Sequence, residues 1–166
     1  MVYHELQRRI YENKVRRNFN VTDVGKEVVL MSEEFGELCD AYLTNNDDEI
    51  TDAIGDLMVY CLGLSAMFKW HADEVLNPKV ESPNNPTSLE NFFPYIGREV
   101  GMIAKTFKKS NKQAVDEINN RDQFRNHIGN LMGYCSMMFD YVHTDGISVL
   151  EEIIGNNERR THQGQI

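Results

Sequence analysis

A ten-residue segment of this chain occurs twice, and the two copies differ chiefly in their acidic residues. The first copy reads DAIGDLMVYC (52–61) and the second reads NHIGNLMGYC (126–135). Isoleucine, glycine, leucine, methionine, tyrosine and cysteine recur in register, whereas Asp52 and Asp56 both become asparagines. A packing role alone would not separate the copies in this way. The repeat therefore predicts a duplicated scaffold whose functional acidic site is kept only in the first copy.

The duplication extends upstream of this segment. VGKEVVLMSEEF (24–35) recurs as IGREVGMIAKTF (96–107), and NNDDEIT (45–51) recurs as NNRDQFR (119–125). The apolar skeleton is again shared and acids are again lost, since Glu33, Glu34 and Glu49 become Lys105, Thr106 and Gln123.

Helical periodicity covers nearly the whole sequence, and no segment alternates apolar and polar residues as a half-buried strand does. Three of the four prolines lie between residues 78 and 86. The sequence therefore predicts an all-α helical bundle. Asn20 or Thr22 is expected to cap the second helix. Helices are expected over 2–17 and 23–44, and over 89–109, 113–142 and 148–155. Between these two groups, a third helix is expected to run from the turn at 45–48 to residue 70, with a short extension to 76. A frayed polar tail is expected after residue 155.

Two segments, 53–68 and 128–139, are apolar almost all round, which is typical of buried helices. A repeat that cannot bury such a helix alone is expected to pair with its copy. We therefore predict an intramolecular pseudo-dimer of two repeats, 1–77 and 89–166, joined by a linker at 78–88 and sharing one core. The two central helices are expected to approach closely at Gly55, Gly63, Gly129 and Gly133.

The formal net charge of −9 argues against a nucleic-acid-binding surface. No run of eighteen or more uncharged apolar residues is present, so no membrane span is expected. The N-terminal residues lack the apolar stretch of a secretory signal, and the three cysteines form no CxxC pair. These features predict a cytoplasmic protein with reduced thiols.

Acidic side chains of the second and third helices are expected to converge. At about 100° per residue, Glu49, Asp52 and Asp56 share one face of their helix. Glu34 and Glu37 share a face of the preceding helix, which a short turn makes an antiparallel neighbour. Convergent carboxylates suit magnesium, which takes oxygen ligands and leaves positions open for water and phosphates. Solvated helix faces are the alternative, but unpaired charges are costly in a helix as apolar as the third.

These residues resemble the all-α nucleoside triphosphate pyrophosphohydrolases of the MazG type. EEFGE (33–37) matches the family motif EExxE, and the acidic helix DAIGDLMVY (52–60) follows after a short turn. The lead-in at 13–38 is also similar. The resemblance covers residues 1–70 well and the second repeat only as a degenerate copy. In the family's second motif, ExxD, the glutamate position is Ala53 here, and Glu49 and Asp52 are the available substitutes.

The resemblance implies a hydrolase that cleaves an NTP or dNTP between the α and β phosphates, releasing a monophosphate and pyrophosphate. Magnesium, or manganese in its place, would be the cofactor, and Glu33 or Glu34 would orient or deprotonate the attacking water. One active site per chain is expected, with the second repeat covering the core and lining part of the pocket. The expected metal ligands are Glu34, Glu37, Glu49, Asp52 and Asp56.

Four further residues are candidates for substrate binding. Lys14 and Arg17 would contact phosphates, unless they belong to a solvated face of the first helix. Asn77 and Lys79 follow the third helix, where family members often place polar substrate contacts. Two other functions stay open: a nucleotide-binding or sensing module without turnover, which Ala53 favours, and a helical protein-interaction module. The sequence also leaves open whether the pseudo-dimer pairs with a second copy.

Overall fold

The structure is a computed structural model that describes residues 1–164, and every regular element in this range is a helix. The predicted all-α bundle is thus confirmed. The elements are α1 (Val2–Arg16), α2 (Val24–Leu43), α3 (Asp47–Met67), α4 (Ala72–Val75), η1 (Leu89–Phe92), α5 (Phe93–Ser110), η2 (Val115–Glu117), α6 (Arg121–Tyr141) and α7 (Gly146–Arg159).

Side-chain caps account for the starts of three long helices. The carboxylate of Asp23 accepts a hydrogen bond from Lys26 N at the start of α2, and the amide oxygen of Asn46 accepts one from Glu49 N at the start of α3. Asp145 caps α7 in the same way. Asn20, which we expected to cap α2, instead forms the preceding turn by accepting from Asp23 N at 2.9 Å.

The helix expected over 113–142 is interrupted, and α6 begins only at Arg121. The cause is a tertiary contact in the backbone: Val24 N donates to Gln113 O at 2.9 Å, and Val115 N donates to Thr22 O at 2.8 Å. These bonds form a short bridge between Asp23 and Ala114, and they occupy groups that a helix would need.

The C-terminal region also differs from expectation. α7 is longer than predicted, because Asp145 caps it before Ser148, and it continues to Arg159. The following residues, expected to fray, fold back on the end of α1, where Gly164 N donates to Arg17 O at 2.8 Å.

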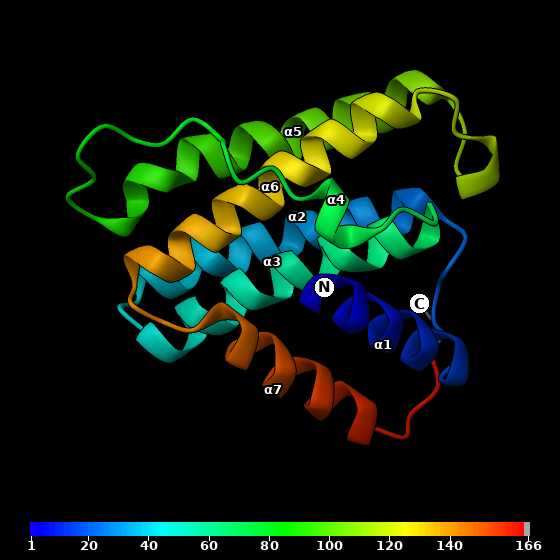
Figure 1. Cartoon of the computed structure of the whole chain (residues 1–166), viewed down its shortest axis with the longest axis horizontal. Coiled ribbons are helices and arrows are strands. Elements are labelled where there is room, and N and C mark those ends of the chain that lie inside the picture. Colours follow the sequence, from blue (N-terminus) through cyan, green and yellow to red (C-terminus); the bar gives the residue numbers. More distant parts are fainter. Residues whose placement is uncertain (165–166) are drawn as a thin grey trace.

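Figure 1 shows the helices in three layers, α5 with α6, then α2 with α3, then α1 with α7. Contacts between α3 and α6 and between α2 and α5 join the first two layers, and α3 also contacts α1 and α7. The α2–α3 and α5–α6 pairs therefore meet as two halves of a pseudo-dimer would, while the duplication itself stays a prediction.

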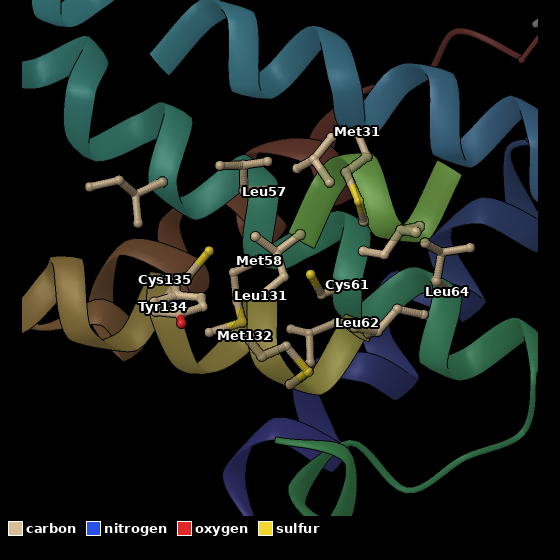
Figure 2. Close-up of a cluster of buried hydrophobic side chains, with 14 of the residues drawn as sticks. Met31, Leu57, Met58, Cys61, Leu62, Leu64, Leu131, Met132, Tyr134 and Cys135 are labelled. Atoms are coloured by element: carbon tan, nitrogen blue, oxygen red, sulfur yellow. The ribbon is translucent and has the colours of Figure 1, made fainter. Parts of the chain in front are cut away.

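The core lies where α3 meets α6. Leu57, Met58 and Cys61 of α3 are fully buried, as are Leu131 and Met132 of α6, and Figure 2 shows these side chains packed together. Among the described residues, α3 is the one helix long and apolar enough to suit a membrane span. Most of it is buried inside the bundle, which accounts for that composition.

The helix glycines do not serve the α3–α6 contact that we predicted for them. A Cβ at Gly55 would lie 2.4 Å from Ile153 of α7, and the nearest side chain to Gly63 is Ile10 of α1. A Cβ at Gly129 would lie 2.1 Å from the carbonyl of Val75, the last residue of α4, and one at Gly133 would lie 2.1 Å from the carbonyl of Asn77, just after it. These glycines therefore admit the elements that flank the central pair, since side chains of ordinary size fill the space between α3 and α6.

Candidate functional site

A cavity of about 410 Å³ lies between α1, α2, α3, α7 and the residues that follow α7. Carboxylates from two adjacent helices line it, Glu34 from α2 and Asp52 and Asp56 from α3. The α2–α3 turn is short, so the two helices pack side by side and bring these acids to one place. The structure therefore brings together three of the acids that the sequence singled out.

Burial and mutual repulsion raise the pKa values of two of these acids. The pKa of Glu34 rises to about 7, first because the side chain is half-buried and then because of the charges of Asp56, Glu37 and Glu33. The pKa of Asp56 rises to about 6, again mainly through burial, with Asp52 and Glu37 adding to it. Ionising both acids at neutral pH is therefore costly without a cation nearby.

One oxygen of this group has no partner. The Oε2 atom of Glu34 is buried and makes no hydrogen bond within the described part of the chain. An unsatisfied buried oxygen costs free energy unless a ligand, an ion or a water reaches it. As the side chains stand, no three acids or other metal-binding groups of residues 1–164 are arranged to hold a metal ion. Carboxylate oxygens are nevertheless the donors that a hard cation such as magnesium prefers, and Glu34, Asp52 and Asp56 would have to move closer together to bind one.

The remaining predicted acids lie at greater distance from the cavity. Glu37 and Glu33 are exposed and do not line it, although both charges raise the pKa of Glu34. Glu49 is exposed near the start of α3 and is also outside the cavity lining. Ala53 is buried in the core. Of the two substitutes considered for the missing glutamate, Asp52 is therefore the one that lines the cavity.

Both basic residues predicted on the first helix line the cavity. The ammonium of Lys14 lies 2.5 Å from Oε2 of Glu27, a carboxylate that is itself buried. Arg17 is buried as well, and its guanidinium donates to the carbonyl oxygens of Asn157 at 3.0 Å and His162 at 3.1 Å. Neither residue belongs to a solvated helix face.

Asn77 and Lys79 lie outside this cavity. The Asn77 side chain donates to the Asn130 amide oxygen at 2.9 Å, and its backbone N–H donates to Gly129 O at 3.1 Å. Lys79 is exposed. Asn77 instead borders a separate recess beside Asn126 and Asn130, the counterparts of Asp52 and Asp56.

The sequence analysis missed the contribution of the C-terminal region to the cavity. Asn156 and Asn157 from the end of α7, with Arg160 and His162 beyond it, form part of the lining. The segment ERRTHQ does contain two arginines and a histidine, but its polar composition was interpreted as a frayed end. Only its contact with α1 reveals its position.

Searches against protein-family models, curated proteins and solved structures found no match to this chain. The resemblance to MazG-type enzymes therefore depends on the motif residues alone.

Proposed function

We propose that this protein is a magnesium-dependent nucleotide pyrophosphohydrolase, which hydrolyses an NTP or dNTP to a monophosphate and pyrophosphate. The observation that carries the proposal is the carboxylate group Glu34, Asp52 and Asp56, brought together without a paired cation in a cavity that basic residues also line. Convergent acids with a raised pKa, in a concave site, are typical of functional groups.

Magnesium held by Glu34, Asp52 and Asp56 would supply positive charge for the phosphates and lower the pKa of a bound water. Glu34 is the better placed of the two proposed general bases, because its free oxygen is buried beside the cavity, whereas Glu33 is exposed. In the metal-free site the pKa of Glu34 is about 7, in part because of the charges of Glu37 and Glu33. A bound magnesium ion would lower that pKa and hold the carboxylate ionised.

The basic residues would act on the anionic substrate. Lys14 forms an ion pair with the buried Glu27. This pairing keeps the Lys14 ammonium beside the cavity, 5.9 Å from the centre of the Tyr60 ring. Arg17 is fixed by carbonyl groups. Cations held in place by such contacts bind phosphates at little cost in side-chain entropy.

A nucleotide-binding module without turnover is the second candidate, and one observation favours it. Ala53 is buried and Glu49 lies outside the cavity, so the glutamate of the family's ExxD motif has no direct replacement at its own position. Under this proposal the protein would bind a magnesium–nucleotide complex and release no pyrophosphate.

Pyrophosphate release from the common NTPs and dNTPs, measured with and without magnesium, tests the first proposal. We expect magnesium-dependent release by the wild type and a loss of about 100-fold or more in Glu34→Gln. Asp48→Asn is the matched control, since Asp48 is an exposed acid that does not line the cavity. Binding of nucleotide with no release by the wild type would favour the second candidate, and equal activity in both variants would refute the site.

A further inference from the structure

The cavity has a basic part, Arg17 with Arg160, of which the proposed function uses only Arg17. Arg17 is 3% exposed, yet no carboxylate pairs with it within residues 1–164. Its guanidinium contacts the carbonyl oxygens of Asn157 and His162 and the His162 ring, whose Nε2 and Nδ1 atoms lie 2.7 and 3.3 Å from Nη2. An arginine has five N–H donors, so one, on Nη1, stays free. A buried cation of this kind calls for an anion.

Arg160 brings a second positive charge to the same place. It follows α7 directly, lines the cavity, and forms no ion pair with any described residue. Its charge lies near the acidic part of the cavity, because Asp56 belongs to the same lining. Two arginines without carboxylate partners therefore line one cavity, and they repel each other unless an anion lies between them.

The segment that carries Arg160 is held in position by close contacts. Gly164 N donates to Arg17 O at 2.8 Å, and a Cβ at residue 164 would lie 2.5 Å from the ring of Phe19. The His162 ring meets the Phe19 ring edge-on, with centroids 5.9 Å apart. The segment is thus docked against the end of α1, and the docking keeps both arginines beside the acids.

We infer that Arg160 and Arg17 form an anion subsite, in which the segment 160–164 supplies the guanidinium that binds the outer phosphates of a polyphosphate group. One guanidinium group can donate two parallel hydrogen bonds to two oxygens of a phosphate, and such charge-assisted hydrogen bonds are among the stronger ones in proteins. The substrate's identity rests on the proposed function. The subsite itself requires only that the protein binds inorganic pyrophosphate.

Titration calorimetry with sodium pyrophosphate tests this inference, in magnesium buffer and again in EDTA. We expect Arg160→Gln to weaken pyrophosphate binding about tenfold, and Arg160→Glu to weaken it further. Arg160 is exposed, so neither substitution endangers the fold. Arg159→Gln is the matched control: it removes the same charge one residue earlier, from a side chain that does not line the cavity. Its binding should stay within about twofold of the wild type.

The outcomes separate this inference from the proposed function. Loss of binding in Arg160→Gln alone supports the subsite, even if no nucleotide is hydrolysed and the proposed function fails. Equal losses in Arg159→Gln and Arg160→Gln would indicate general electrostatic attraction and overturn the subsite. Unchanged binding in Arg160→Gln, or no binding by the wild type, would also overturn it, whether or not the protein hydrolyses nucleotides.

Discussion

The α2–α3 and α5–α6 pairs share a sequence pattern but treat their polar groups in opposite ways. In α6, the amide oxygen of Asn130 accepts from Asn77 at 2.9 Å, and its NH2 group donates to the buried Glu99 at 3.4 Å. The counterpart in α3, Asp56, lines a cavity and has a raised pKa. At this position one pair satisfies its polar group internally, and the other leaves it available to a ligand.

The same contrast holds at the position of Glu34 in α2. Its counterpart in α5, Thr106, is buried and donates its hydroxyl to Met102 O at 2.7 Å. Glu34 instead has a buried oxygen without a partner among the described residues. Because unsatisfied buried groups destabilise a fold, natural proteins keep them mainly where they serve a function.

Different elements flank the two pairs and line the recesses beside them. α3 is flanked by α1 and α7, whereas Gly129, the α6 position equivalent to Gly55, is covered by the backbone carbonyl of Val75 at the end of α4. The recess beside α6 is therefore lined by α4 and the residues that follow it, whereas α1 and α7 line the cavity beside α3. The elements that flank the two helix pairs therefore differ more than the pairs themselves do.

The largest effect is expected from separating the pairs. A fragment of residues 1–77 loses α6 and α7, both of which cover α3, so its apolar face becomes exposed. We expect the fragment to aggregate or remain unfolded in size-exclusion chromatography and circular dichroism, and the fragment 89–166 to restore solubility when co-expressed. A soluble and active fragment of residues 1–77 would show that the first pair folds by itself.

The second-largest effect is expected from exchanging Asp56 of α3 and its counterpart Asn130 of α6. Asp56→Asn gives α3 the residue that α6 has, and we expect nucleotide hydrolysis to fall about 100-fold or more in a protein that stays folded. Asn130→Asp places a carboxylate beside Glu99, so it should lower the free energy of unfolding by about 1–3 kcal/mol without creating activity. Kinetics and denaturant unfolding of both variants measure this. Normal activity in folded Asp56→Asn would refute the assignment.

Glycine substitutions compare the flanks directly. A Cβ at Gly129 meets the Val75 carbonyl at 2.1 Å, so Gly129→Ala should lower the free energy of unfolding by about 1–3 kcal/mol. Gly55→Ala meets side chains and no backbone, the end of Ile153 at 2.4 Å and Val149 at 3.1 Å, and the Ile153 end can rotate, so the loss should be smaller. Gly101→Ala is the control, because nothing lies within 4 Å, and it should stabilise α5 by up to about 1 kcal/mol. Equal losses at Gly55 and Gly129 would contradict this account of the flanks.

The smallest effect concerns pH. The pKa values of Glu34, about 7, and Asp56, about 6, lie above the ordinary 4.5 and 3.8. At a pH between the ordinary and the raised pKa of each acid, the folded state binds more protons than the unfolded state. The metal-free protein should therefore lose stability as pH rises from about 4 to 7. Glu34→Gln removes one such group and should therefore flatten this dependence and raise the melting temperature at pH 8 by about 2–4 °C.

Thermal melts in EDTA across this pH range measure the effect, with Glu49→Gln as the control because Glu49 is exposed and outside the cavity. Added magnesium should then stabilise the wild type more than Glu34→Gln, because a ligand stabilises the state that binds it. If wild type and Glu34→Gln had equal pH profiles and equal magnesium shifts, the surroundings of Glu34 would not raise its pKa and the residue would not bind magnesium.

The sequence alone determined the helical class, the two buried helices and the helix faces that carry Glu34, Asp52 and Asp56. Periodicity and capping act over a few residues, so they can be recognised locally. The tertiary structure decided which elements flank α3, why Glu49 stays outside the cavity and where Arg160 lies. Those outcomes depend on contacts between residues far apart in the chain, such as Gly164 with Arg17 and Gly55 with Ile153, which no local pattern specifies.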